Sequence, residues 1–448
     1  MKRVGNRSRA LLLLVLIVLA GLSFYIFRLL GSGRTWASYP SNQTVYSGGV
    51  LKLGTVLDRN GLVLSTMTDG KRTYAEDKTV RAATLHAVGD LSGNIGTGAL
   101  SQFASRLIGY NFLTGAYSRT GEGKDLRLSI DADLNVAAYK ALNGRKGAVG
   151  VVNYKTGEIL SMVSSPSYDP LNAPDFSANP DKYEGVFINR FLSSAYTPGS
   201  TFKLVTLAAA IENLPDLYDR VFDCEGSLKV GGDIVNDTGK HGKIGIEDAL
   251  AVSCNVAFAQ LALDLGADTL NKYADRLGLT SGIDIDGIKT AAGNFTKAVA
   301  GTADLAWSGI GQYNDTVCPA NMLRYVSAIA NGGVAVNMSL IHETGLKGLL
   351  PAGSQRLLSK DTADKIATMM NYDVYKTYGK DNFPGLELYA KSGTAEVGGG
   401  QSPHSWFVGY ITNKDYPLAF VVVVENGGSG AQNAGKVANT VLQAAIKK

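Results

Sequence analysis

The sequence predicts an α+β main domain with a central antiparallel sheet, flanking helices and a helical insert. A small β-rich module and one N-terminal transmembrane helix precede this domain. Apolar segments typical of β-strands lie at both ends of the region 126–448, with roughly 220 mostly helical residues between them. A long uncharged apolar run also lies close to the N-terminus.

The chain has 448 residues, 45% of them hydrophobic and 18% charged, so it can form two or three domains with real cores. Its 43 basic residues exceed its 39 acidic residues by four. Six basic residues and no acidic one lie within 1–34, so the remaining 414 residues carry 37 basic and 39 acidic side chains, a net charge of −2. This balance argues against a nucleic-acid partner.

The N-terminal run 10–27 contains 18 residues without a charge, close to the minimum that crosses a bilayer. Four basic residues precede it, and the positive-inside rule keeps them in the cytoplasm. The sequence therefore predicts a cytoplasmic stub at 1–9, a transmembrane helix at 10–30, and an extracytoplasmic remainder. A cleaved signal peptide is the alternative, which the poor cleavage sequence at 35–38 disfavours.

The region 31–125 is rich in Gly, Ser and Thr and is expected to be a small non-catalytic module. Within it, 54–64 predicts two short strands around an Asp/Asn/Gly turn. The main domain follows at 126–448, where Asp131 predicts the cap of a helix over 132–142. Apolar runs and helical periodicity predict its other elements: strands at 147–153, 158–163, 386–390, 405–411 and 418–424, and helices at 201–213, 246–265, 319–330 and 436–446.

Cysteine and histidine spacing gives no sign of a metal site. The three cysteines cannot all pair, and no Cys-x-x-Cys or Cys/His spacing typical of zinc sites occurs. The four histidines are far apart in the sequence, so each is expected to be structural or exposed. We therefore expect neither a metal nor another cofactor.

A candidate nucleophile with a nearby base occurs at Ser200-Thr201-Phe202-Lys203, the one Ser-x-x-Lys in the chain. On a helix, positions i and i+3 share a face, so Lys203 can lie beside the Ser200 hydroxyl. The following residues are almost entirely apolar, and burial lowers a lysine pKa toward the range of a general base. The alternative is a helix cap at Ser200 and an exposed lysine at Lys203.

Two further patterns accompany this pair. Of three Ser-x-Asn sequences, only Ser253-Cys254-Asn255 lies downstream of Ser200, and it falls inside an amphipathic run. Its hydroxyl could relay a proton and its amide could orient Lys203 or a substrate. Of two Lys-Ser/Thr-Gly sequences, the second, Lys391-Ser392-Gly393-Thr394, continues a strand, and its lysine and hydroxyls suit a substrate carboxylate.

With these three motifs the chain resembles the penicillin-binding proteins and serine β-lactamases. The similarity covers about 320 residues, and Asp-Arg-Asn-Gly at 58–61 resembles the N-terminal module of monofunctional, class B members. It rests on further segments in the family's order: 147–169, 189–203, 241–258, 309–319, 391–396 and 405–410. The region between the anchor and the main domain is shorter than usual for class B and far too short for a glycosyltransferase domain.

The resemblance implies a penicillin-binding transpeptidase, β-lactamase-like fold. It implies Ser200 as the acylated nucleophile, Lys203 as its base, and Ser253 and Asn255 in proton relay and substrate orientation. Ser200 and Thr394 would supply the backbone N–H groups of an oxyanion hole.

The same resemblance assigns the substrate carboxylate to Lys391, Ser392, Gly393 and Thr394. It implies cross-linking of peptidoglycan stem peptides, inhibition by β-lactam antibiotics, and a SEDS-type membrane glycosyltransferase as partner.

Four other functions use a related domain. A β-lactamase is disfavoured because the Glu-x-x-Asn element of class A enzymes is absent from the sequence. A membrane sensor would need a larger membrane portion, and an inactive scaffold would not keep every catalytic residue. A D,D-carboxypeptidase is the hardest to exclude, because water and amine acceptors compete for the same acyl-enzyme.

Overall fold

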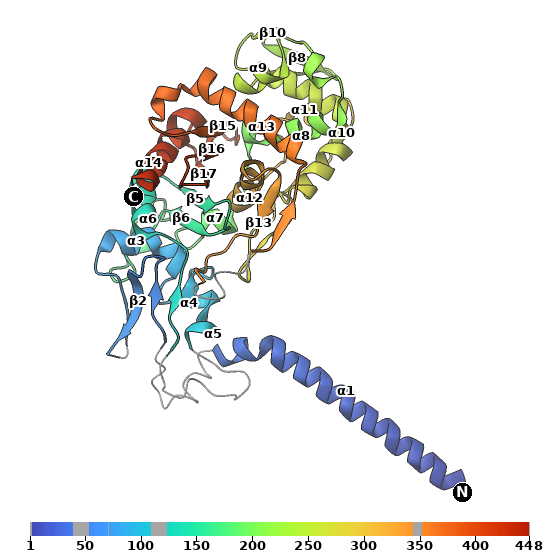
Figure 1. Ribbon diagram of the computed structural model, residues 1–448, viewed down its shortest axis with the longest axis vertical. Coiled ribbons are helices and arrows are strands. Elements are labelled where there is room, and N and C mark those ends of the chain that lie inside the picture. The colour runs from blue at the N-terminus through green and yellow to red at the C-terminus, as the bar shows by residue number, and fades with distance from the viewer. Residues whose placement is uncertain (1, 39–52, 70, 109–122, 344–351, 448) are drawn as a thin grey trace.

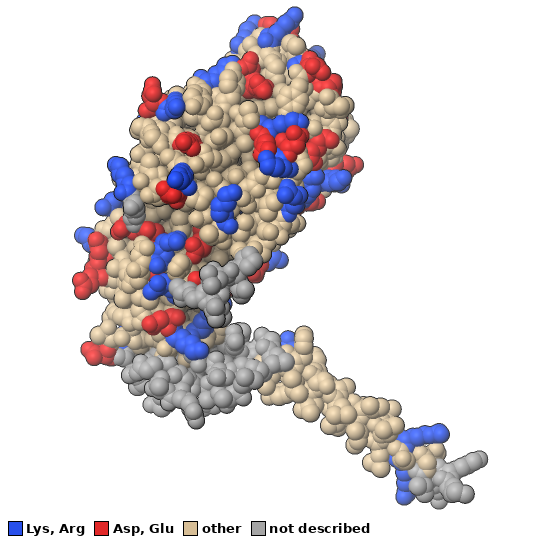
Figure 2. Space-filling model, viewed as in Figure 1, with Lys and Arg blue, Asp and Glu red and all other residues tan. Residues whose placement is uncertain are grey.

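The computed structural model describes residues 2–38, 53–69, 71–108, 123–343 and 352–447 (Figure 1). Parts of the expected module, at 39–52 and 109–122, lie outside the described residues. Helix α1 (Lys2–Ser38) extends away from the rest of the molecule. Its segment Gly5–Leu29 is long and apolar enough to cross a membrane. Figure 2 shows an uncharged surface along most of α1 and basic side chains near its N-terminal end.

The module that follows α1 contains a four-stranded sheet in the order β3-β2-β1-β4. Strands β1 and β2 flank the turn predicted within 54–64, which confirms that hairpin. The module also contains helices that the Gly-, Ser- and Thr-rich composition obscured. Its elements are β1 (Val56–Leu57), β2 (Val63–Thr68), β3 (Lys71–Tyr74), α3 (Lys78–Val88), α4 (Ala99–Gln102), α5 (Ala104–Leu107) and β4 (Leu126–Arg127).

The Asp58 turn fastens this module to the main domain. Asp58 is 2% exposed, and its Oδ1 accepts hydrogen bonds from the backbone N–H groups of Asn60 and Leu62, both at 2.8 Å. Its Oδ2 accepts from Ala132 N at 3.1 Å, in the first turn of α6 (Ala132–Leu142). Asn60 adds a bond from Nδ2 to Asp131 Oδ2 at 3.0 Å. The Asp-Arg-Asn-Gly sequence therefore joins two parts of the fold.

We expect Asp58→Ala to lower the free energy of unfolding by about 3 kcal/mol, because three backbone donors at a buried site lose their acceptor. Urea unfolding followed by tryptophan fluorescence measures the change. Glu76→Ala removes an exposed carboxylate of the same module and serves as the control. Equal unfolding midpoints for the two variants would contradict this function of Asp58.

The main domain is built on a five-stranded antiparallel sheet in the order β15-β16-β17-β5-β6. Strand β17 pairs with β5, so the sheet joins the two ends of the domain as the sequence predicts. Strand β15 lies at one edge, and its middle and end carry Lys391 to Thr394. The strands are β5 (Gly147–Asn153), β6 (Ile159–Ser165), β15 (Leu388–Ala395), β16 (His404–Ile411) and β17 (Leu418–Val424).

Alternating side chains of this sheet form two layers of core. One face, with Val149 and Val422, packs against α6 and the C-terminal helix α14 (Gly435–Ile446). The other face, with Ala148 and Val423, belongs to a larger core that contains the helical insert. Val56 and other side chains of the N-terminal module belong to this same continuous core.

The helical insert occupies the region between β6 and β15 and covers one face of the sheet (Figure 1). Its long helices are α8 (Lys203–Asn213), α10 (Asn255–Arg276), α12 (Pro319–Ala330) and α13 (Lys360–Asp373). Shorter elements connect them: α7 (Arg190–Ser193), β7 (Phe222–Cys224), β8 (Ser227–Val230), β9 (Asp233–Asn236), β10 (Gly242–Ile244), α9 (Ile246–Ala251), β11 (Asp284–Ile285), β12 (Ile288–Lys289), α11 (Ala303–Ser308), β13 (Val334–Val336) and β14 (Ser354–Arg356).

Candidate active site

Ser200 lies in a turn of 3₁₀-helix, Gly199–Phe202, and α8 begins directly after it at Lys203. The helix predicted from residue 201 therefore starts two residues later, after a tighter turn. Residues i and i+3 are eclipsed in a 3₁₀ turn, so Ser200 and Lys203 share one face. Gly199 has a φ of +53°, and a Cβ there would lie 2.8 Å from the Thr394 carbonyl oxygen. The turn consequently packs against the β15 edge.

Ser253 lies at a break between two helices. The predicted single helix over 246–265 is wrong at this point, because α9 ends at Ala251 and α10 begins at Asn255. Ser253 has a φ of +55°, a conformation that a non-glycine residue seldom adopts and that is common near active sites. Both helices bury apolar faces, so the hydrophobic pattern continues across the break and conceals it.

Lys391, Ser392, Gly393 and Thr394 lie on β15, as the sequence predicts. Gly393 faces the Ser200 turn, because a Cβ there would lie 2.8 Å from Pro198 O and 2.9 Å from Thr201 Cγ2. A larger residue would push the strand away from the nucleophile. This close approach places the Lys391-Ser392-Gly393-Thr394 motif beside the turn that carries Ser200.

The Ser253 hydroxyl connects the two lysines of the site. Its Oγ lies 3.2 Å from Nζ of Lys203 and 3.2 Å from Nζ of Lys391, and both lysines are fully buried. Lys203 Nζ also donates to Ser253 O at 2.5 Å and to Asn255 Oδ1 at 2.8 Å. The three motifs, far apart in the sequence, therefore form one hydrogen-bonded cluster.

The buried environment of Lys203 lowers the pKa of its amine. Burial lowers the pKa of Lys203 to about 7, and the positive charge of Lys391 acts in the same direction. The carboxylates of Asp237 and Asp373 oppose the shift through their negative charge. A lysine with this pKa is substantially neutral at neutral pH and can accept a proton from a serine.

Lys391 has a buried acidic partner that no short sequence motif reveals. Its Nζ lies 3.6 Å from Asp373 Oδ2, and burial raises the pKa of Asp373 to about 6 while it lowers the pKa of Lys391. Tyr378 donates to Asp373 Oδ2 at 2.8 Å and accepts from Ser392 N at 2.8 Å. Asp373 and Tyr378 thus hold Lys391 and strand β15 in position beside Ser253.

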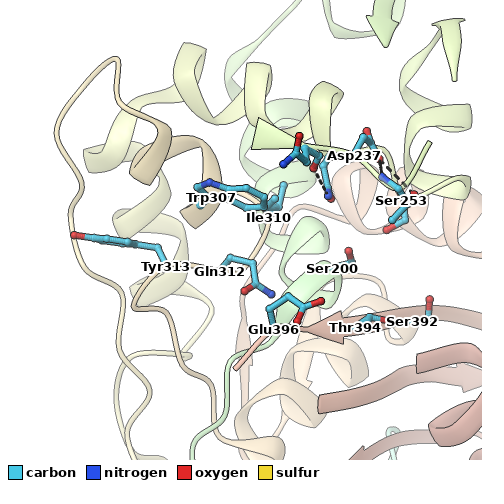
Figure 3. A pocket seen from close by; sticks show the side chains of 13 residues that line it. Ser200, Asp237, Ser253, Trp307, Ile310, Gln312, Tyr313, Ser392, Thr394 and Glu396 are labelled. Carbon is cyan, nitrogen blue, oxygen red and sulfur yellow. Dashed lines mark hydrogen bonds between the residues drawn. The ribbon is translucent and has the colours of Figure 1, made fainter. Parts of the chain in front are cut away.

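These groups surround a cavity of about 610 Å³ (Figure 3). Ser200 lies between the wall that carries Ser392 and Thr394 and the wall that carries Ser253. The duplicate motifs at 92–94, 155–157 and 177–179 do not line this cavity. The residues that line it are Ser200, Asn236, Asp237, Thr238, Ser253, Asn255, Trp307, Ile310, Gln312, Tyr313, Ser392, Thr394 and Glu396.

Known proteins are similar to this chain in sequence and fold. Residues 147–447 match the family described as the penicillin binding protein transpeptidase domain. Peptidoglycan D,D-transpeptidase PbpA of Mycolicibacterium smegmatis is 29% identical over 383 residues, which cover 75% of each chain. Stage V sporulation protein D of Bacillus subtilis is 30% identical over 357 residues, which cover 73% of this chain and 53% of that protein.

The solved structures that resemble this chain belong to the same family as its sequence relatives. Penicillin-binding protein A from M. tuberculosis, solved as an imipenem acyl-enzyme complex, superposes with a TM-score of 0.76 at 26% identity and covers 88% of this chain and 98% of its own. The D,D-transpeptidase domain of a peptidoglycan glycosyltransferase from Eggerthella lenta gives a TM-score of 0.74 at 27% identity with the same coverage. The chain therefore belongs to the penicillin-binding protein transpeptidase family and is of the class B type.

Proposed function

We propose that this protein is a peptidoglycan D,D-transpeptidase that works through an acyl-enzyme on Ser200. The observation that carries the proposal is the Ser253 hydroxyl, which lies 3.2 Å from both lysine Nζ atoms at the cavity that Ser200 lines. One hydroxyl thereby links Lys203, three residues after Ser200, with Lys391 on β15. The activity in the names of the relatives supports the same function.

In the proposed acylation, neutral Lys203 accepts the Ser200 proton, and Ser200 Oγ attacks the carbonyl carbon between the last two D-alanines of a stem peptide. Backbone N–H groups of Ser200 and Thr394 stabilise the oxyanion. Lys391, Ser392 and Thr394 bind the terminal carboxylate, while Gly393 allows the strand to approach.

The proton then returns to the leaving group. Protonated Lys203 passes it through the Ser253 hydroxyl to the departing amine as the peptide bond breaks and D-alanine leaves. Asn255 orients Lys203 through its 2.8 Å contact. An amine of a neighbouring stem peptide attacks the ester that remains on Ser200, which forms the cross-link and frees the serine. β-Lactams acylate the same serine in this proposal, and the imipenem acyl-enzyme complex of the M. tuberculosis relative supports acylation by this class of antibiotic.

The proposed topology brings the site to this substrate. Residues 1–9 remain in the cytoplasm, 10–30 cross the membrane, 31–125 form the non-catalytic module, and 126–448 form the transpeptidase domain outside. The basic N-terminal end and the apolar segment Gly5–Leu29 support this orientation. A SEDS-type membrane glycosyltransferase is the proposed partner, since the proposed reaction forms the peptide cross-link and requires glycan strands that another enzyme makes.

Product analysis tests the function against the D,D-carboxypeptidase alternative. Full-length protein in detergent is incubated with a stem peptide that ends in D-Ala-D-Ala, with and without an amine acceptor, and mass spectrometry identifies the products. We expect an acceptor-dependent cross-linked product. Release of D-alanine without any cross-link at every acceptor concentration would assign a carboxypeptidase instead.

Tyr378→Phe is expected to lower the second-order rate constant of penicillin acylation about tenfold, since the partly buried Ser392 N–H loses its acceptor. Tyr378 is a positioning residue, so apparent binding should weaken more than the maximal acylation rate falls. Stopped-flow measurement with a fluorescent penicillin separates the two. Tyr375→Phe is the matched control, because this tyrosine is 54% exposed. Equal binding constants in the two variants would refute the positioning function.

A further inference from the structure

A second cavity lies in the helical insert and shares no lining residue with the cavity that Ser200 lines. It has a volume of about 390 Å³, and its walls come from α12, β11, β14 and the C-terminal end of α10. Sites for small ligands typically have volumes of about 300–1,000 Å³. The charged side chains that line it are Asp275, Arg276, Asp284 and Arg324.

Arg324 is the buried charge of this cavity. The residue is 8% exposed, although its guanidinium reaches the cavity wall. Its Nη2 donates to Gln355 Oε1 at 2.8 Å. Its Nη1 lies against Gly278, where a Cβ would be 3.1 Å away. Gln355 and Gly278 both line the cavity, so both terminal nitrogens of Arg324 lie at its surface.

The positive charge of Arg324 is not balanced within the described chain. No carboxylate there lies within ion-pair distance of the guanidinium, and burial is the cause that lowers the pKa of Arg324. The carbonyl oxygens of Gly278 and Ser281 already accept from Asn321 Nδ2, at 2.8 and 2.7 Å. Arginine is almost never buried unless it is paired. An anionic group from outside the chain is therefore the missing partner.

The other charges of the cavity restrict what that partner can be. Arg276 is balanced by Glu212, with Nη2 and Oε2 2.9 Å apart. Asp275 and Asp284 are exposed, and neither forms an ion pair in the part of the chain that the structure describes. Asp284 Oδ1 accepts from Gly287 N at 3.0 Å, a neutral donor. Two free carboxylates repel a polyanion, whereas a ligand with one carboxylate and one ammonium group satisfies both signs of charge.

We propose that this cavity binds a short zwitterionic peptide. The C-terminal carboxylate of the peptide pairs with Arg324 through the N–H groups that Gln355 leaves free, since a guanidinium matches a carboxylate in two parallel hydrogen bonds. The ammonium group of the peptide lies near Asp284. A free dipeptide and the amine-bearing end of a stem peptide share this chemistry. The site rests on the charges of the cavity and does not depend on the proposed function.

Isothermal titration calorimetry of the full-length protein in detergent tests the site. The Ser200→Ala variant is the parent protein, so that no peptide is consumed. We expect D-Ala-D-Ala to bind, its C-terminal amide to bind at least about tenfold more weakly because the carboxylate is lost, and N-acetyl-D-Ala-D-Ala to lose part of the affinity. Nα-acetyl-L-Lys-D-Ala-D-Ala, with its free side-chain amine, represents the end of a stem peptide, and comparison with the dipeptide identifies the preferred source.

Substitutions in the parent protein assign the two charges. Arg324→Met retains most of the apolar stem and should weaken D-Ala-D-Ala and its N-acetyl form alike, at least about tenfold. Asp284→Asn retains the Oδ1 acceptor for Gly287 N, so it should weaken the free dipeptide and leave the N-acetyl form unchanged. Arg356→Met is the matched control, because it removes an exposed arginine next to Gln355 that does not line the cavity.

The outcomes decide the proposal. Absence of D-Ala-D-Ala binding in the parent, equal affinities in Arg324→Met and Arg356→Met, or tight binding of the amide would each overturn the site. Thermal unfolding checks that Arg324→Met is folded. If it is not, the exposed Asp284→Asn decides, and an unchanged affinity for the free dipeptide would refute the site. If penicillin never acylates the wild type but Arg324→Met loses the peptide, the proposed function fails while this site stands.

Discussion

Ser200→Ala is expected to abolish covalent labelling by a fluorescent penicillin, with a loss on the order of 10⁶-fold in the rate of acylation, as for other serine nucleophiles. The Ser200 hydroxyl oxygen is the proposed site of the ester, whereas the Ser253 hydroxyl lies 3.2 Å from Nζ of both Lys203 and Lys391. In-gel fluorescence of the full-length protein measures the label.

A matched variant separates chemistry from folding. Ser193→Ala removes an exposed hydroxyl in the preceding helix α7 and should keep full labelling. Thermal unfolding of Ser200→Ala should match that of the wild type, because Ser200 is only partly buried beside an open cavity. Persistent labelling of Ser200→Ala would move the nucleophile elsewhere.

Lys203→Met should lower acylation about 10²- to 10⁴-fold, the usual contribution of a general base. Methionine retains most of the apolar stem of lysine, so the buried site stays filled while the amine is lost. Stopped-flow acylation of the variant and the wild type gives the ratio. A variant that retains more than a tenth of the wild-type rate would assign the base to another group.

The pH dependence of the wild type follows from the same lysine. Because the pKa of Lys203 is lowered to about 7, the amine is protonated and inactive below that pH, and acylation should rise through pH 7 to a plateau. Lys391→Ala removes the neighbouring charge that helps to lower this pKa, so its midpoint should move to higher pH while substrate binding weakens. An unchanged midpoint in Lys391→Ala would show that the two lysines are not coupled.

Regular elements and motif residues could be predicted from the sequence. The predicted helices at 132–142 and 319–330 and the strands at 147–153 and 418–424 coincide with α6, α12, β5 and β17. In each segment, periodicity and local end signals agree with the final packing. The lysines and hydroxyls of the three motifs could also be predicted as candidate site residues. Each motif had one copy that lay on a predicted helix or strand in the expected order along the chain.

Other features depend on contacts that no local pattern records. The break at Ser253 is hidden because α9 and α10 both bury apolar faces. The contacts of its hydroxyl with Lys203 and Lys391 join residues far apart in the sequence. Asp373 and Tyr378 lie at the end of α13 and in the turn after it, and only the packing of that segment on β15 gives them a function. Cys224, Asp237, His241 and Cys254 likewise come together only when β7 and β10 fold beside α10.

The continuous core shared by the N-terminal module and the main domain determines how the protein can be shortened. Because Val56 packs in the same core as Ala148, a truncation at residue 126 would strip apolar cover from the sheet and leave β4 without its partner β1. The two parts should unfold in one cooperative transition. A soluble fragment should therefore omit α1 alone and begin upstream of Leu53. The N-terminal module is then expected to stabilise the fold of the main domain as well as to separate it from the membrane.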